Sequence, residues 1–541
     1  MLPFSSLRTP DRSRRWLVAL AALVPVLTGL ALVTLPPAAP AHARARAGAP
    51  ALSVSPATYV GGQRLTWTGS VGAPGARTLV LQLHMGRPGD RWTTVDGFRA
   101  RTRADGSFSF SYPAPGMFNI RYRVKAGRHL SPSRLFVAKT QDLTLRVTGQ
   151  PPNNTGEPAL VPAGRAFGIT VDTTPDDIFR SPSSRGLPVF AGRTLTLQRR
   201  VDGDTWSKVA TTTVGDDGLG RFAGLTEEPG VAVFRVREED YREDGNAIGW
   251  TQSFPLYVYV GPEAAARYEE LRRAALASVS LPPPGSAMFG SGAPTPTASE
   301  RYRWYPLYWD FAWEHGQSLT GGPTRGTRDR GHWVDYTDGA GRVSKQNGQL
   351  TLDSKRFYGA GPGDFGTTRA TLHGNAAAQG RWEARMRIRG AYESGGRAYG
   401  VLAELVPAKA ADYDCGKHNI EIARITPFSR RVQFGVRSPK YRWSGATTAS
   451  ATPLRSAYAV AVEVSGTHIT WFLDGKPVGS VTDRAAIPGV PMTLRLSLEG
   501  DGQQEMNQAS LVSDWQRGFP IDSGRPTVSG HRLSRHAARG C

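Results

Sequence analysis

The sequence predicts an all-β protein made of several sandwich domains. Short runs that alternate apolar and polar residues recur along most of the chain, and turn signals such as Asp105-Gly106 and Asp217-Gly218 separate them. Glycine (62 residues) and proline (40 residues) are abundant, as expected where strands are joined by short turns. A chain of 541 residues, 39% of them hydrophobic, is long enough for about three or four domains with ordinary cores.

The first 43 residues have the three parts of an export signal. Arg14 and Arg15 precede an apolar run at residues 16–35, and Ala41-His42-Ala43 is a small-residue cleavage pattern. We therefore expect a signal peptide over residues 1–43 and a secreted, extracellular protein that is released or stays associated with the cell wall. An uncleaved signal anchor is the alternative, because about 20 apolar residues can span a bilayer.

The net charge narrows the choice of partner. Lysine and arginine (66) exceed aspartate and glutamate (45), which gives +21, and the excess is spread along the chain. A nucleic-acid-binding protein would gather basic residues on one face with aromatic residues between them, so we expect no nucleic acid. Extracellular or cell-wall polysaccharides, acidic ones included, are the expected partners, with no membrane insertion after signal cleavage. A basic surface that only aids solubility is the other interpretation, and the oligomeric state stays open.

The first half of the chain beyond the signal contains an internal repeat. Residues 77–82 (Arg-Thr-Leu-Val-Leu-Gln) recur at 193–198 (Arg-Thr-Leu-Thr-Leu-Gln), an offset of 193 − 77 = 116 residues, and Trp92 corresponds to Trp206. The repeat predicts two similar antiparallel β-sandwiches. We expect both tryptophans to be core or strand residues rather than platforms for sugar rings.

Pattern and composition set the bounds of the two repeats, of a linker and of the C-terminal tail. In pattern, residues 50–138 and 139–260 resemble bacterial immunoglobulin-like (Ig-like) modules, which implies two spacer or adhesive β-sandwiches. Residues 261–300 follow as a Pro/Gly-rich linker that opens with a short helix at Pro262. Residues 520–541 are basic with almost no apolar pattern, and we expect this tail to be disordered.

Residues 301–519 carry the most specific sequence phrases. Residues 380–388 alternate as a strand, and residues 469–478 predict a hairpin that turns at Asp474-Gly475. Three further runs with strand patterns lie at residues 347–352, 492–496 and 509–515. In their order along the chain, these five runs together resemble glycoside hydrolase family 16. The resemblance implies a concanavalin A-like jelly-roll sandwich whose concave sheet forms an open cleft for β-linked glucans or galactans.

The resemblance assigns the catalytic positions to one strand, where two of three carboxylates are replaced. Residues 419–424 (Asn-Ile-Glu-Ile-Ala-Arg) stand where the family has Glu-x-Asp-x-x-Glu. Asn419 takes the nucleophile position, Glu421 that of the assisting aspartate, and Arg424 that of the acid/base. Retaining hydrolysis needs two carboxylates about 5 Å apart. An amide is a poor nucleophile and arginine does not release its proton, so we expect a degenerate site that retains only Glu421.

The register of this strand leaves alternatives open. If Glu421 were the nucleophile, Ala423 and Thr426 would take the other two positions, and one carboxylate would again remain. Regular alternation places Asn419, Glu421 and Ala423 on one face, unless a bulge brings Arg424 to the same side. If Glu421 faces an arginine in the cleft, we expect the pair to keep this carboxylate ionised and structural.

Other residues are candidates for parts of the site. Glu383, Glu404 and Glu463 could supply a second acid, although no spacing places them opposite Glu421. Candidate sugar-binding residues are His418, which could also act as a base, and the aromatic residues Tyr392, Tyr399, Tyr413, Tyr441 and Trp443.

We expect that no cofactor is required, and the histidine and carboxylate spacings do not predict zinc. The family resemblance allows a structural calcium ion, with Asp514 at a position that often helps to bind it. Cys415 and Cys541 could form a disulfide or remain free thiols. Three functions are compatible with the sequence. We favour polysaccharide binding or adhesion at the cell surface. The others are an active endo-glycosidase or transglycosylase that uses Glu421 and a second carboxylate, and a cell-wall structural protein.

Overall fold

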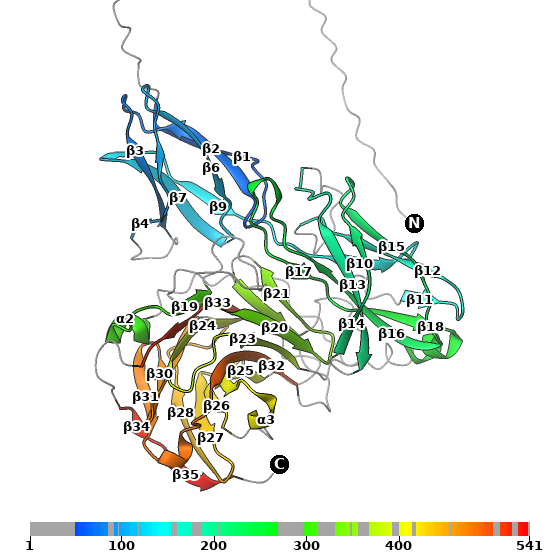
Figure 1. Ribbon diagram of the computed structural model, residues 1–541, viewed down its shortest axis with the longest axis vertical. Helices are drawn as coiled ribbons and strands as arrows, with labels where there is room; N and C mark the ends of the chain where they lie inside the picture. The colour runs from blue at the N-terminus through cyan, green and yellow to red at the C-terminus, as the bar shows by residue number, and fades with distance from the viewer. Residues whose placement is uncertain are drawn as a thin grey trace, which may run out of the picture. The chain divides into compact units, whose positions relative to one another are not determined.

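The computed structural model divides the chain into two units, residues 1–45 and 46–541. The described residues all belong to the second unit (Figure 1): 49–84, 91–95, 97–116, 118–150, 152, 159–175, 186–202, 205–268, 296–311, 331–346, 349–354, 367–391, 400–413, 418–454, 456–500, 509–521 and 529–538. The predicted signal peptide lies outside them. The described part is almost entirely strands, so the all-β prediction is confirmed.

Residues 51–137 form a first sandwich of two antiparallel sheets. The smaller sheet has the order β1-β2-β6: β1 (Ala51–Ser55), β2 (Arg64–Ser70) and β6 (Ser107–Pro113). The larger has the order β4-β3-β7-β8, with β5 and β9 at its margins: β3 (Thr78–His84), β4 (Thr93–Thr94), β5 (Ala100–Arg101), β7 (Phe118–Ala126), β8 (His129–Leu130) and β9 (Arg134–Val137). Trp67, Leu81, Tyr122 and Phe136 are fully buried in one core between the sheets.

Residues 144–260 form a second sandwich with its own core. One sheet has the order β10-β12-β15: β10 (Thr144–Val147), β12 (Phe167–Asp172) and β15 (Leu219–Leu225). The other has the order β11-β18-β16-β13-β14, with β17 on β16: β11 (Ala159–Val161), β13 (Thr194–Asp202), β14 (Thr205–Thr213), β16 (Gly230–Glu238), β17 (Thr251–Gln252) and β18 (Leu256–Val260). The repeated phrases occupy β3 and β13, and each pairs with the corresponding long strand, β7 or β16.

Two large sheets form the third domain. The first has the order β21-β22-β33-β24-β29-β30-β31-β34, with β19 on β33: β19 (Trp309–Phe311), β21 (Arg342–Gln346), β22 (Gln349–Asp353), β24 (Gly380–Ala391), β29 (Tyr458–Val464), β30 (Ile469–Leu473), β31 (Lys476–Val481), β33 (Ala509–Phe519) and β34 (His531–Arg532). The second has the order β20-β23-β32-β25-β26-β27-β28-β35: β20 (His332–Thr337), β23 (Thr368–His373), β25 (Gly400–Pro407), β26 (Ile420–Ile425), β27 (Arg431–Arg437), β28 (Tyr441–Thr448), β32 (Met492–Glu499) and β35 (Ser534–Ala537).

One core cluster joins these two sheets, with Trp382 and Trp471 from the first and Ile420 and Leu496 from the second. The predicted hairpin is present as β30 and β31. Its turn residues Asp474 (φ 49°) and Gly475 (φ 71°) both lie in the left-handed region that such a two-residue turn requires.

Helical segments are short. They are residues 262–268, η1 (Glu243–Gly245), α2 (Ala298–Tyr302), α3 (Ala410–Tyr413) and η3 (Arg484–Ala486). None of the described helices is long and apolar enough to cross a membrane. The helix at 262–268 agrees with the start expected at Pro262, and residues 269–295 lie outside the described part. Tyr302 at the end of helix α2 packs against Phe472, and Trp304 just after the helix packs against Phe472 and Phe519. Ala298 belongs to the same cluster, so the end of the predicted linker is part of the third domain.

The prediction of a wholly disordered tail is wrong. Strand β35 pairs with β28 and β34 pairs with β31. Leu533, between them, is only 8% exposed and belongs to the core of the third domain. A single apolar residue has no periodicity for a sequence pattern to detect, whereas the unpaired backbone edge of β28 gives this segment hydrogen-bond partners.

Candidate functional site

Strand β26 contains a bulge at the candidate site. Glu421 pairs with Gly435 and Arg424 with Gln433, so β26 advances three residues while β27 advances two. The extra residue brings Glu421 and Arg424 to the same face of the sheet. Ala423 is instead fully buried in the core, so its expected place beside Glu421 is wrong. The sequence left a bulge as an alternative to regular alternation, and the structure contains this bulge.

Arg424 lies between two carboxylates. Its Nε donates to Glu421 Oε1 at 2.7 Å, and its Nη1 donates to Glu499 Oε2 at 3.1 Å. The side chains of Arg424, Glu421 and Glu499 are 35%, 33% and 29% exposed, so solvent reaches all three. Burial alone would lower the pKa of Arg424, but the two carboxylates outweigh it and raise this pKa above its ordinary value. The guanidinium therefore keeps its proton.

Glu404, one of the candidate second acids, is buried beside this network. It lies on β25 opposite Glu421. Arg495 Nη2 lies 2.6 Å from Glu404 Oε1, and Asn419 Nδ2 donates to Glu404 Oε2 at 2.8 Å. Burial raises the pKa of Glu404, and Arg495 opposes that shift. Asn419 is thus a hydrogen-bond donor to a buried carboxylate.

The other two candidate acids lie on the first sheet of the third domain, whereas β26 belongs to the second. Glu383, on β24, accepts hydrogen bonds from the Ala298 backbone N–H at 2.6 Å and from the Ser299 hydroxyl at 2.5 Å. Glu463, on β29, pairs with Arg381 at 2.5 Å and with His468 at 2.8 Å. Both carboxylates are buried in contacts with other residues of the third domain.

The expected aromatic platform is largely not found among the described residues. Trp443 is only 2% exposed and belongs to the core, so its assignment as a sugar-binding residue is wrong. Tyr441 is half-buried, and the Arg535 guanidinium carbon lies 4.7 Å from its ring centroid. His418 is a half-buried turn residue with φ 66° just before β26. The candidates outside the described side chains are Tyr392, Tyr399, Tyr413, Cys415 and Cys541.

Sequence reasoning missed Glu499 and Arg495, which both lie on β32. Alternation along β32 places Thr493, Arg495, Ser497 and Glu499 on the face opposite the buried leucines, a pattern that is visible in the sequence. The pattern does not say which strand lies beside β32, so it could not bring Glu499 to Arg424.

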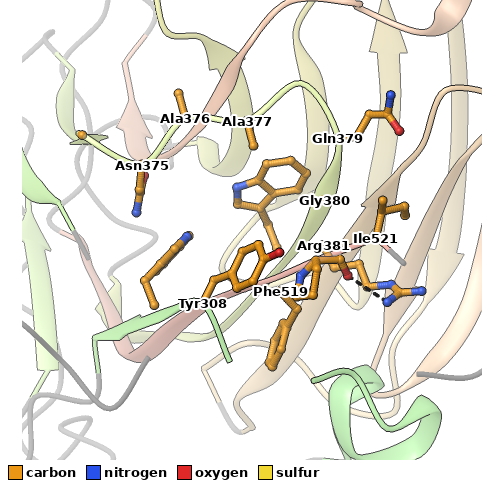
Figure 2. A pocket seen from close by; sticks show the side chains of 14 residues that line it. Tyr308, Asn375, Ala376, Ala377, Gln379, Gly380, Arg381, Phe519 and Ile521 are labelled. Carbon is orange, nitrogen blue, oxygen red and sulfur yellow. Dashed lines mark hydrogen bonds between the residues drawn. The ribbon is translucent and has the colours of Figure 1, made fainter. Parts of the chain in front are cut away.

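A pocket of about 450 Å³ lies elsewhere, where β19, β24 and β33 meet (Figure 2). Tyr308, Gln379 and Phe519 line it, and none of the β26 residues does. Arg381 at its wall donates to the Pro520 carbonyl at 2.9 Å, and this guanidinium also pairs with Glu463. The Arg381 guanidinium at this pocket is therefore already paired within the protein.

Asp514, at the position that the resemblance links to calcium, is held by two side chains. Arg385 donates to one oxygen of this carboxylate and Gln349 donates to the other, and calcium binding stays a prediction. Among the described residues, no group of three or more His, Cys, Asp or Glu side chains is arranged to hold a metal.

No family model matches the chain, and no curated protein matches its sequence. Among solved structures it is similar to a non-specific endo-β-1,3(4)-glucanase from family GH16 (16% identity, TM-score 0.31, 44% of this chain and 96% of that chain). It is also similar to an endo-β-1,3-glucanase from Pyrococcus furiosus (14%, 0.31, 41% and 96%) and to the catalytic domain of a laminarinase from Thermotoga petrophila RKU-1 (15%, 0.30, 41% and 99%). Similarities at this level say nothing about activity.

Proposed function

We propose that this chain is a secreted polysaccharide-binding protein of the cell surface. In this proposal the third domain is a family 16-like jelly roll whose two-carboxylate site is degenerate, and the two preceding sandwiches act as Ig-like spacers. The observation that carries the proposal is the position of Arg424, which lies between Glu421 and Glu499 on the half-exposed face of β26 and β32.

The chemistry of this network favours binding over hydrolysis. A general acid must give up a proton near the working pH, and a guanidinium flanked by two carboxylates does not. The same ion pairs leave further donor and acceptor sites on half-exposed side chains, and sugar hydroxyls can use both kinds. Each such hydrogen bond contributes about 0.5–1.5 kcal/mol, so useful affinity would come from an extended polymer that engages several of them.

An active glycosidase remains the second candidate because Glu499 is a second half-exposed carboxylate near Glu421. In that case Arg424 would have to move away when substrate binds, since it now occupies both carboxylates. A cell-wall structural protein is the third candidate and would require no binding at this face.

The test measures release of reducing ends and cosedimentation in parallel, with β-1,3-, β-1,4- and mixed-linkage glucans and with galactans. We expect the full chain to bind at least one polymer without releasing sugar, and Arg424→Met to weaken that binding about fivefold. Arg532→Met, at an exposed arginine on β34, is the matched control and should bind normally. Sugar release that Glu421→Gln abolishes would overturn the proposal, and a folded protein that neither binds nor cleaves would leave the structural role.

A further inference from the structure

The internal repeat preserves a three-residue contact in both of the first two sandwiches. Arg123 Nε donates to Gln82 Oε1 at 2.9 Å, and the Arg123 guanidinium carbon lies 4.0 Å from the ring centroid of Trp92. We name this set of three residues the first cluster. It joins β3 and β7, beside β4.

The second sandwich repeats the contact at matching positions. Arg235 Nε donates to Gln198 Oε1 at 2.7 Å, and its guanidinium carbon lies 4.3 Å from the ring centroid of Trp206. The offsets from the first cluster are 198 − 82 = 116, 235 − 123 = 112 and 206 − 92 = 114 residues. We name these residues the second cluster.

The second cluster binds a carboxylate. Arg235 Nη1 donates to Asp335 Oδ2 at 2.6 Å, and Gln252 Nε2 donates to the same oxygen at 3.2 Å. Burial alone would raise the pKa of Asp335, but Arg235 and Gln252 outweigh it and hold this pKa below its ordinary value. Gln198 holds one edge of the Arg235 guanidinium and the Trp206 indole covers its face. The guanidinium then donates to Asp335 from another N–H group.

The first cluster has the same Gln-Arg-Trp contact, with neither an acid nor a counterpart of Gln252 among the described residues. Gln82 is buried, whereas Arg123 and Trp92 are half-buried, so the cluster reaches solvent. Desolvation lowers the pKa of Arg123, and no described carboxylate opposes that shift. A half-buried guanidinium that is held on two sides favours an incoming carboxylate, because its planar fork is already oriented to donate charge-assisted hydrogen bonds.

We propose that the first cluster binds the carboxylate of a uronic acid residue in an acidic polysaccharide. Its surroundings favour a glycan over a protein partner, because the neighbouring Thr93, Thr94 and Arg121 are exposed and polar, whereas the centre of a protein interface is mostly apolar. The inference deepens the proposed function and rests on it for the class of partner. It adds a second contact point, outside the third domain, that selects charged polymers.

The test compares the full chain with Arg123→Met in binding to polygalacturonate and to its methyl-esterified form, measured by titration calorimetry. We expect the wild type to bind polygalacturonate about tenfold more tightly than Arg123→Met, the scale of one lost charge-assisted contact. Arg128→Met, at an exposed arginine of the same sandwich, should bind like the wild type. The neutral ester should bind weakly to every variant. Arg123→Lys keeps the charge but loses the planar contact with Gln82, so we expect an intermediate affinity from a variant that still folds.

Three results would overturn the inference. Equal affinities of Arg123→Met and Arg128→Met for polygalacturonate would show that the cluster takes no part in binding. Equal binding of the acid and the ester would show that the carboxylate is not recognised. Poly-glutamate binding as tightly as polygalacturonate, with the same loss in Arg123→Met, would assign the cluster to acidic proteins. Arg424→Met separates this inference from the proposed function, because the inference expects the Arg123 effect to persist in that background even if the third domain binds no glycan.

Discussion

At position 424 a guanidinium contacts two carboxylates at once, so one side chain balances the charge of Glu421 on β26 and of Glu499 on β32. Glu421 and Glu499 both pair with Arg424, so either carboxylate would have to lose that contact before it could act alone. Sequence comparison with the family motif predicts the replaced positions. It does not predict Glu499 or Arg495, because residues far apart in the sequence meet only once β32 and β26 flank β25.

The buried pair of Glu404 and Arg495 gives a stability prediction. Arg495→Met leaves a buried carboxylate without its cation, and we expect a loss of about 3–5 kcal/mol in the free energy of unfolding. Combining it with Glu404→Gln removes the stranded charge, so the double variant should be more stable than Arg495→Met alone. Urea denaturation measures both. A double variant as unstable as the sum of the two single variants would show that the residues are not coupled.

Glu383 gives a pH-dependent prediction. Its pKa is raised from 4.5, chiefly because the group is buried, with Ser299 opposing the shift. A raised folded-state pKa contributes stability that is present below the unfolded pKa and is lost as the pH rises through the folded value. Glu383→Gln cannot titrate, so wild-type stability should fall relative to this variant between about pH 4 and the folded pKa, by at most about 1.4 kcal/mol per pH unit. Parallel curves for the two proteins, from thermal unfolding across that range, would refute this assignment.

At the scale of elements, alternation and turn residues predict strands well and irregularities poorly. The phrases at β24 and at the β30–β31 hairpin are visible because polar and apolar residues alternate and Asp-Gly favours the turn. The bulge in β26 is invisible, since Ile422 and Ala423 are both acceptable in a regular strand and only pairing with β27 selects the extra residue. Strand β35 escapes detection because its four residues are all exposed and polar or small.

The C-terminal segment gives a prediction for packing. Leu533→Ala removes a buried side chain that packs beside Gly445 and Gly479. We expect this change to lower the free energy of unfolding by about 2–3 kcal/mol. Arg532→Ala, next to it but exposed, should change stability by no more than about 0.5 kcal/mol. Chemical denaturation of the two variants side by side measures the difference. Equal, small effects would mean that the segment does not pack in solution.

For the whole molecule, the all-β class follows from composition and turn patterning. The sequence could not reveal that the repeated phrases carry matching Gln-Arg-Trp clusters, because each arginine comes from a strand outside the repeated phrase. The net charge of +21 is a property of the complete chain and does not depend on any one site. It acts on partners at a distance, in addition to the local contacts at Arg123 and Arg424.

The charge predicts how binding responds to salt. Raising sodium chloride from about 0.05 M to about 0.5 M shortens the screening distance to a few ångströms, so the affinity for polygalacturonate should fall at least about tenfold. Affinity for a neutral β-glucan should change less than about twofold, because hydroxyl contacts involve no long-range attraction. Cosedimentation at several salt concentrations measures both polymers. The same salt response for the two would mean that net charge has no part in polymer selection.

The bulge in β26 also determines what a protein engineer would face when adding carboxylates to this strand. The backbone already turns position 424 toward position 421, so new side chains could place acidic groups at both positions without rerouting the chain. The difficulty would be electrostatic crowding, because Glu404 and Glu499 already contact this network and Arg424 is the cation that neutralises two of its acids. Without a replacement cation, two added carboxylates would raise one another's pKa, and at least one of them would tend to take up a proton.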